Sequence, residues 1–422
     1  DQNDWAGTGF PDHHLLSAAV PRNPVAVTRI DGHALLANAA AMEAASITVQ
    51  TKDPGGGRIL RDASGNPTGV FVDAAAALIR RVVPPDPPAR LREGIRLAIE
   101  ELHRYGVTGI HDAGVSPATI DLYARMARAG EFDLRDYVMI SATADSLDRW
   151  LPKGPVADLT GDGRITVRAI KMVADGALGS RGAALLEDYA DEPGNAGLET
   201  ESRDHIEAVA ERALRSGFQL CVHAIGDRGN RNVLDAFEAA LKKVPVADHR
   251  FRIEHAQVLH PEDLPRFAKL GVIPSMQAQH QTSDMYWAGR RLGPSRTLGA
   301  YAWRSLLDSG VVIPGGSDFP VEKPDPLAAY HAAVSRQDAR NWPAGGWHPE
   351  QRMTRAEALA HLTIWPAYAS FSEARLGSLR SGKLADLVVL SADLETIPVE
   401  ELESVRVELT LFDGRLVYED RP

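Results

Sequence analysis

Four residues that can bind a metal or transfer a proton each close a short apolar run in this sequence. The runs are Arg168-Ala-Ile-Lys171, Gln219-Leu-Cys-Val-His223, Arg252-Ile-Glu-His255 and Val311-Val-Ile-Pro-Gly-Gly-Ser-Asp318. Runs of this length predict buried strands. In a barrel of parallel strands the carboxyl ends meet at one mouth, so we expect the four side chains to share a site there. Two imidazoles and a carboxylate in such a place favour a divalent metal that activates water.

The two histidines are the strongest part of this pattern. His223 and His255 lie 32 residues apart, the length of one strand–helix unit, so neighbouring strands are expected to end in them. Neutral imidazole is a good ligand for zinc and similar ions. The alternative is that each is a hydrogen-bonded histidine of the core. Equivalent positions on adjacent strands favour metal binding over that alternative.

Lys171 is unusual because a lysine that ends an apolar strand is costly to bury unless it is paired or chemically changed. Its amine can lose its charge and react with carbon dioxide to give a carbamate, whose two oxygens could bridge two metals. The alternative is an ion pair with nearby Asp175. The accompanying histidines favour the carbamate.

Asp318 follows three small residues, which allow a close approach to the strand end. A carboxylate beside a metal-bound water can accept its proton and pass it to a leaving group. The alternative is that Asp318 caps the amino terminus of a following helix. Pro320 and Pro324 would delay that helix, so the catalytic role is favoured.

Five further residues are candidates for substrate binding, and each also has a structural explanation. They are Arg29, His33, His111, His280 and Trp287. His111 ends an earlier strand, and His280 follows the apolar run 272–276. Trp287 belongs to an aromatic segment in a long loop. For Arg29 and His33, which lie in a turn-rich region, a structural role is the stronger alternative.

The elements that must position these residues alternate along the middle of the chain. Strands are predicted near 107–111, 135–141, 165–171, 218–223, 251–255, 272–276 and 311–315, and helices near 117–129, 203–216, 229–242, 261–270, 298–309 and 325–340. This alternation predicts an α/β fold with a parallel sheet. An open doubly wound sheet could use seven strands, but chemistry at four separated strand ends favours a (β/α)₈ barrel. The first of its eight strands is then expected to lie before Asp1.

The two ends of the chain have a different texture. Residues 1–88 are rich in turn signals and are predicted to form an inserted cap, with strands at Val25–Arg29 and Gly69–Val72 and helices at Ala34–Ala45 and Asp73–Arg81. Residues 89–365 are predicted to form the barrel. Residues 366–422 are predicted to form a small β-sandwich appendage that needs further strands or the barrel as a partner.

Composition restricts the partners. The chain has 422 residues, a formal net charge of −11 and a single cysteine, Cys221. The charge argues against nucleic-acid binding, and no apolar run approaches the roughly 20 residues that cross a membrane. One cysteine excludes an internal disulfide but leaves the cellular compartment open. Of the two possibilities, a cytoplasmic protein is favoured over a secreted one. The expected partner is a small-molecule amide, and a homodimer is compatible with the sequence.

At these residues the chain resembles the amidohydrolase superfamily, in particular its amidohydrolase 3 group of YtcJ-like and N-substituted formamide deformylase-like proteins. The segments that carry the resemblance are Lys171-Met-Val-Ala-Asp-Gly-Ala-Leu-Gly-Ser180, Val222-His-Ala-Ile-Gly-Asp227, Ile253-Glu-His-Ala-Gln257, Ser275-Met-Gln277, Gly316-Ser-Asp-Phe-Pro320, Arg29-Ile-Asp-Gly-His-Ala34 and Gly382-Lys-Leu-Ala-Asp-Leu-Val-Val389. The family also has a His-x-His pair on the first barrel strand, and no His-x-His occurs in this sequence. The resemblance therefore places that pair before Asp1.

The resemblance implies a metal-dependent hydrolase of a non-peptide C–N bond in an amide, N-acyl or N-formyl compound. It implies that Lys171 is a carbamylated bridging ligand, that His223 and His255 bind one or two divalent ions, most simply zinc, and that Asp318 is both a ligand and the general base and acid. Two alternatives stay open. The same metal centre could hydrolyse lactones or esters or remove amino groups, since one barrel supports many reactions. The chain could also be a small-molecule-binding barrel without catalytic activity.

Overall fold

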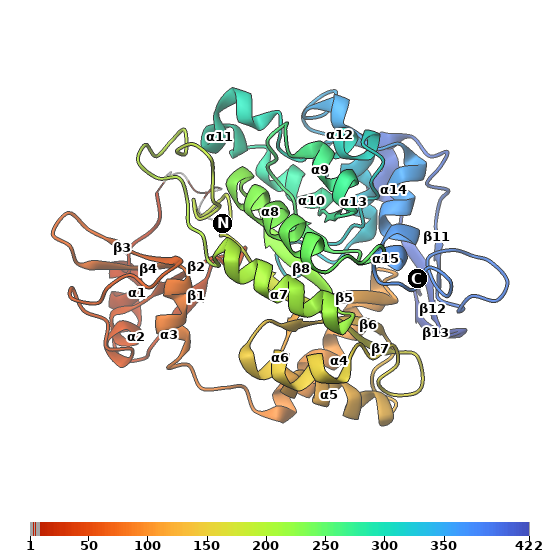
Figure 1. Ribbon diagram of the computed structural model, residues 1–422, viewed down its shortest axis with the longest axis horizontal. Helices are drawn as coiled ribbons and strands as arrows, with labels where there is room; N and C mark the ends of the chain where they lie inside the picture. Colours follow the sequence, from red (N-terminus) through yellow and green to blue (C-terminus); the bar gives the residue numbers. More distant parts are fainter. Residues whose placement is uncertain (1–2, 4, 6–8, 422) are drawn as a thin grey trace.

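The computed structural model describes residues 3, 5 and 9–421, and at its centre six parallel strands form a curled sheet (Figure 1). The strands are β5 Gly109–Val115, β6 Arg135–Ser141, β7 Ile165–Val173, β8 Gln219–Ala224, β9 Arg252–His255 and β10 Ile273–Ser275. They lie in the order β10-β9-β8-β7-β6-β5, so chain neighbours are also neighbours in the sheet. A doubly wound sheet would reverse its order at a switch point. The prediction of an α/β, TIM-barrel-like fold is therefore confirmed.

The run 311–315, expected as a seventh strand, forms a single parallel bridge between Met276 and Gly315. The carbonyl of Ile313 lies 2.7 Å from Nδ1 of His361, and the N–H of Gly315 donates to the carbonyl of His361 at 2.7 Å. Pro314 has no N–H to donate. The backbone groups of a full strand are thus used by the helix that holds His361, and the strand prediction was wrong here. Among the described residues no strand joins β5 to this run, so the sheet is open.

Twelve α-helices follow the cap within the described part of the chain, and most of them cover the outer face of the sheet (Figure 1). They are α4 Pro88–Arg104, α5 Pro117–Arg128, α6 Ala144–Trp150, α7 Arg203–Ser216, α8 Asp227–Lys243, α9 Leu264–Leu270, α10 Ala278–Asp284, α11 Ala288–Thr297, α12 Trp303–Asp308, α13 Pro326–Ser335, α14 Arg355–Leu362 and α15 Ile364–Ala369. In the described residues, none of the helices is both long and apolar enough to cross a membrane.

Two of the helices that are shorter than predicted are cut short by one residue that leaves the helical region. Tyr301 has a φ of +52°, so the helix expected over 298–309 begins only at Trp303. Arg336 has a φ of +61° and ends α13, which was expected to reach residue 340. Such left-handed conformations are uncommon outside glycine and stop a right-handed helix.

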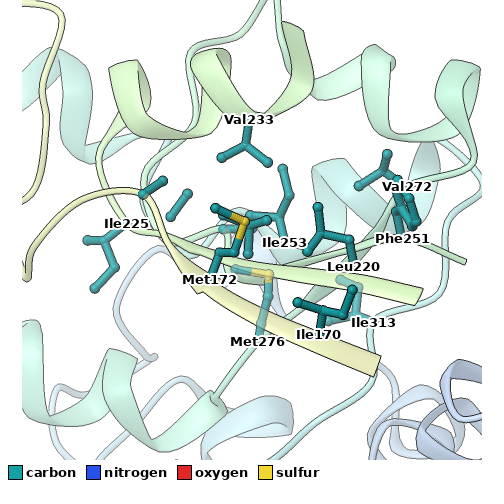
Figure 2. Close-up of a cluster of buried hydrophobic side chains, with 14 of the residues drawn as sticks. Ile170, Met172, Leu220, Ile225, Val233, Phe251, Ile253, Val272, Met276 and Ile313 are labelled. Atoms are coloured by element: carbon teal, nitrogen blue, oxygen red, sulfur yellow. The ribbon is translucent and has the colours of Figure 1, made fainter. Parts of the chain in front are cut away.

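Apolar side chains fill the layer between the strands and the helices. Ile170 of β7, Leu220 of β8, Ile253 of β9 and Val233 of α8 are all 0% exposed. Figure 2 shows them gathered with Met172 and neighbouring side chains, with Val233 reaching from its helix toward the strands. Because successive strand residues point to opposite faces, the residues between these apolar ones face the interior of the sheet. This alternation decides which side chains can reach a site inside the curled sheet.

The cap is an antiparallel sheet with short helices, at the left of Figure 1. Its strands, in the order β1-β2-β4-β3, are β1 Ala26–Thr28, β2 Ala34–Ala37, β3 Gly57–Arg61 and β4 Pro67–Asp73, and its helices are α1 His14–Ala19, α2 Ala39–Ala44 and α3 Ala77–Arg80. The single helix predicted over Ala34–Ala45 was wrong. Pairing of β2 with β1 and β4 overrides the helical preference of alanine, and extended Asn38 then caps α2.

The carboxyl-terminal strands form one antiparallel sheet of β11 Leu387–Leu390, β12 Val407–Phe412 and β13 Arg415–Glu419. A sandwich has two sheets, and among the described residues the carboxyl-terminal segment forms only this one. It packs beside α4, where the hydroxyl of Thr410 donates to the carbonyl of His103 at 2.7 Å. The barrel therefore supplies the packing partner that so small a sheet needs.

Candidate functional site

The strand register brings two of the predicted ligands, His223 and His255, to one end of the sheet. Val173 of β7 lies opposite His223 of β8, and Ala224 lies opposite His255 of β9. Alternation alone would point Glu254 inward and His255 outward. The φ of His255 is +76°, which turns the chain at the end of β9. The two imidazole rings consequently meet edge to face, with their centres 4.6 Å apart.

Each imidazole has one nitrogen next to a protein acceptor. Nδ1 of His255 lies 2.7 Å from the side-chain oxygen of Gln277, and Nε2 of His223 lies 3.3 Å from the carbonyl of Gly176. Burial lowers the pKa of His255 to about 4 and lowers the pKa of His223 well below its ordinary value. Both rings are therefore neutral near pH 7, and each keeps a second nitrogen that can bind a cation.

Lys171 faces the sheet interior, and burial lowers the pKa of its ammonium group. Across the described residues its side chain makes no hydrogen bond or ion pair. The expected alternative partner, Asp175, is engaged elsewhere: its carboxylate accepts backbone N–H bonds from Ala184, Ile225 and Gly226 at 2.8–2.9 Å. Burial nevertheless raises the pKa of Asp175 to about 7. The ion-pair explanation of Lys171 therefore has no support in the geometry.

Asp318 lies just beyond the 311–315 run, on the rim of a cavity. Its φ is +54°, a conformation that is sparsely populated for a residue with a side chain. Asp325 accepts N–H bonds from Leu327 and Ala328 and caps the next helix, α13. The alternative role of Asp318 as a helix cap is therefore excluded.

A cavity of about 300 Å³ opens at these strand ends. Seven of the nine predicted site residues line it: Arg29, His33, His223, His255, His280, Trp287 and Asp318. Arg29 and His33 come from the cap, so cap and barrel build the cavity together. Nε2 of His280 is buried and has no hydrogen-bond partner among the described residues, which leaves it available to a bound molecule.

Lys171 and His111 do not line this cavity and lie deeper in the sheet interior. Nδ1 of His111 is 2.9 Å from the guanidinium of Arg252, which also binds Glu254 and Ser275. Burial lowers the pKa of His111 to about 3, so its ring is a neutral acceptor for Arg252. The structure thus places His111 in a polar network beneath the cavity.

The residues fit a metal in part. His223 and His255 each present a free nitrogen of a neutral ring, and the amine of Lys171, whose pKa burial lowers, lies deeper in the sheet interior. No group of three or more histidine, cysteine or carboxylate side chains is arranged around one point in the part of the chain described here. The two histidines can therefore supply two ligands of a metal site, and at least one further ligand is needed to complete it.

Sequence reasoning missed several polar residues of the site. Gln277, which holds His255, and Gln257 each follow a strand end by two residues, in segments that were noted only for their resemblance. Asp284 lines the cavity, and burial raises its pKa to about 7 beside Tyr301. Asp73 of the cap binds His33. No sequence spacing connects Asp73 with the barrel, so only the fold could reveal it.

Comparison with known proteins gives a family match over almost the whole chain. The family model described as the amidohydrolase family matches residues 1–418. The chain belongs to the amidohydrolase family. YtcJ of Bacillus subtilis (strain 168), named as an amidohydrolase, is 33% identical over 434 residues, covering 99% of this chain and 80% of the relative. N-substituted formamide deformylase of Arthrobacter pascens is 30% identical over 437 residues, covering 97% of this chain and 76% of the relative.

The fold of this amidohydrolase is similar to that of a solved structure. An uncharacterised metal-dependent hydrolase from Pyrococcus furiosus superimposes with a TM-score of 0.71 and 27% sequence identity. The match covers 94% of this chain and 77% of the other. The predicted place in the YtcJ-like, amidohydrolase 3 group is therefore confirmed.

Proposed function

We propose that this amidohydrolase is a metal-dependent enzyme that hydrolyses the C–N bond of a small N-acyl or N-formyl amide. The observation that carries the proposal is the pair of neutral imidazoles, His223 and His255, whose rings lie 4.6 Å apart beside a cavity. The relative named as an N-substituted formamide deformylase supports an amide as the substrate class. The similar structure from Pyrococcus furiosus, named as a metal-dependent hydrolase, supports the proposal that the enzyme uses a metal ion.

The residues divide into those that hold the ion and those that handle the substrate. His223 and His255 would hold a divalent ion, with zinc as the expected element, and Lys171 and Asp318 are proposed as the further ligands. A carbamate on Lys171 would give that side chain the negative charge a ligand needs. When bound, such an ion supplies Lewis acidity toward a carbonyl oxygen and lowers the pKa of water.

The protein's own groups supply proton transfer and orientation. Asp318 stands on the cavity rim, where a carboxylate can accept a proton and return it to the departing amine nitrogen. Arg29, His33, His280 and Trp287 line the same cavity and are proposed to orient the substrate. Buried Trp287 and Leu178 also line the cavity and offer apolar surface to the substrate.

Metal content tests the first half of the proposal. The purified protein is expected to contain zinc, manganese or iron in elemental analysis, and the double variant His223→Ala/His255→Ala is expected to lose it. His260→Ala is the matched control, because His260 is part-exposed and interacts with Glu262 at the surface. Equal metal content in the double variant and the control would remove the two histidines from the metal site.

Substrate profiling tests the second half. N-alkyl and N-aryl formamides and acetamides are expected to turn over, whereas lactones, esters and aminopyrimidines of similar size are not. Asp318→Asn should lower kcat by about 100-fold or more while leaving the metal in place, because it removes the proton carrier. Turnover of lactones alone would replace the amide by an ester-type substrate, and unchanged kcat in the variant would remove Asp318 from its role.

A further inference from the structure

The cavity at the strand ends carries more negative than positive side chains. The carboxylates that line it are Asp31, Asp284, Asp318 and Glu322. Among the described lining residues the only lysine or arginine is Arg29, whose guanidinium is paired with Asp31. With Asp318 proposed as a metal ligand, Asp284 and Glu322 are left, and neither has an ion-pair partner among the described residues.

Asp284 and Glu322 belong to the same part of the cavity. Asp284 is the last residue of α10, and the hydroxyl of the residue before it, Ser283, donates to Oε1 of Glu322 at 2.5 Å. Burial raises the pKa of Asp284 to about 7, and the charge of Glu322 acts in the same direction. A cation bound beside the two carboxylates would relieve their repulsion.

Gln257 adds a neutral acceptor next to Asp284. Its side chain lines the cavity, and the residue is only 4% exposed. Its Nε2 donates to Oδ2 of Asp284 at 3.0 Å and to the hydroxyl of Tyr301 at 2.7 Å. These contacts fix the amide so that Oε1 is left for the cavity, and no described residue donates to Oε1. Since buried polar groups are normally paired, a ligand with a hydrogen-bond donor is expected here.

His280 relates these acceptors to the metal-site residues. It lies four residues before Asp284 in α10, so the two side chains share a helix face about one turn apart. Its ring centre lies 5.9 Å from that of His255, and its buried Nε2 has no partner among the described residues. A substrate whose reacting bond lies beside His255 would reach Asp284 through a chain that spans roughly 5 Å, one helical turn. Trp287 and Leu178 line the cavity and offer apolar surface to such a chain.

We propose that Gln257, Asp284 and Glu322 bind an ammonium group at the far end of the substrate's N-substituent. An alkylammonium group has three N–H donors and no acceptor, and these three side chains offer acceptors to the cavity. The proposal rests on the amide hydrolysis proposed above and adds a substrate class. The substrates are N-acyl or N-formyl derivatives of a diamine, in which a short alkyl chain separates the amide from the charged nitrogen.

The first test compares N-(4-aminobutyl)formamide with N-pentylformamide, which has a terminal methyl group in place of the ammonium group. The KM should be about 10- to 100-fold lower for the ammonium compound, because hydrogen bonds to charged groups are strong. The kcat values should be similar, because the charged end lies away from the reacting bond. N-(4-carboxybutyl)formamide should have the highest KM of the three. Equal KM values, or the lowest KM for the carboxylate compound, would overturn the proposal.

Glu322→Gln is the variant that isolates the charge, because glutamine can still accept the hydroxyl of Ser283. It should raise the KM of the ammonium compound about 10-fold, and Asp284→Asn should act in the same direction. Glu262→Gln is the matched control, because the side chain of Glu262 is 78% exposed and pairs with Arg231. The control should leave the KM ratio of the two formamides unchanged. An unchanged ratio in both cavity variants, or an equal loss with both formamides, would overturn the proposal.

Equilibrium binding separates this inference from the proposed function. If neither formamide is hydrolysed, the proposed function fails, and calorimetric titration of the same two compounds into the unaltered protein still decides the inference. The ammonium compound should bind at least about 10-fold more tightly than N-pentylformamide, and Glu322→Gln should remove most of the difference. Equal affinities would refute the inference. A difference that survives in both Glu322→Gln and Asp284→Asn would also refute it, because the amine would then bind elsewhere.

Discussion

The protonation states of single residues decide what this site can do. His223 and His255 stay neutral because burial lowers the pKa of each ring, and the nearby His255 lowers the pKa of His223 further. Their acceptors, Gly176 and Gln277, fix which nitrogen of each ring stays free. The buried amine of Lys171 has its pKa lowered by the same desolvation. Neutral imidazoles such as these two can bind a cation without first losing a proton.

Burial has the opposite effect on Asp136, which lies in β6 next to Asp112. Burial and the neighbouring carboxylate raise the pKa of Asp136 well above its ordinary value of 3.8. The folded state therefore keeps a proton that the unfolded state loses above about pH 3.8, so stability falls as pH rises through the folded pKa. Asp136→Asn removes this loss, and its amide can donate to Asp112. We expect the variant to gain about 1–3 kcal/mol at neutral pH in urea titrations.

The pH dependence provides the check on this explanation. The gain of Asp136→Asn should shrink toward zero in acid, where the aspartic acid is protonated in both states. Asp148→Asn is the matched control, because the side chain of Asp148 is 77% exposed, and its stability should follow that of the unaltered protein. A gain that is equally large in acid would mean that the effect comes from packing and not from ionisation.

The helices and strands that could be predicted from sequence are those whose own residues indicate where they begin and end. The strand 135–141 and the helix 203–216 have the predicted bounds, because the strand is an apolar run and the helix lies between a Ser202 cap and left-handed Gly217. The run 311–315 and the segment Ala34–Ala45 failed because their backbone partners lie far away in sequence, on α14 and on β4. Local propensity cannot report a partner that only the fold supplies.

Asn38 shows how one such partner holds the cap elements together. Its fully buried side chain accepts N–H bonds from Val25 and Ala41 and donates to the carbonyls of Val20 and Asn23. Asn38→Ala leaves these four backbone groups unpaired, and we expect a cost of about 2–5 kcal/mol to the local stability of the cap. Hydrogen exchange of residues 26–44 should accelerate.

The matched control for this element is Gln50→Ala, which changes an exposed residue of the same cap. Its exchange should equal that of the unaltered protein, and exchange in β7 and β8 should be unaffected in both variants. If the barrel strands also exchanged faster in Asn38→Ala, the cap would not unfold as a separate unit.

For the molecule as a whole, the site depends on parts that are far apart in sequence. The expectation that functional residues lie at the carboxyl ends of parallel strands was enough to select His223, His255 and Asp318. It needs only the alternation of strands and helices along the chain. It also selected Lys171 and His111, which lie below the cavity, because it does not resolve depth along a strand. The same expectation cannot select Asp73, because Asp73 belongs to the cap and not to a barrel strand. Residues that line the cavity could thus be predicted where topology fixes their place, and the residues that hold them in position could not.

Arg135 is a buried link between the barrel and the carboxyl-terminal sheet. Its guanidinium donates to Asp386 at 3.0 Å and to Asp413 at 3.1 Å, and lies 4.8 Å from the centre of the Phe412 ring. The side chains of Arg135 and Asp386 are 7% and 6% exposed, so the pair is buried. Arg135→Met would leave the carboxylate of Asp386 buried without its partner, which costs about 3–5 kcal/mol.

We expect this loss to release the sheet from the barrel and leave the barrel folded. Hydrogen exchange in β11, β12 and β13 should accelerate in Arg135→Met, and exchange in β8 should not. Adding Asp386→Asn should restore part of the protection, because it removes the unpaired charge. Arg128→Met, which changes an exposed arginine of α5, should have no such effect. Unchanged exchange in the sheet of Arg135→Met would mean that apolar packing around Phe412, and not the ion pair, holds the sheet in place.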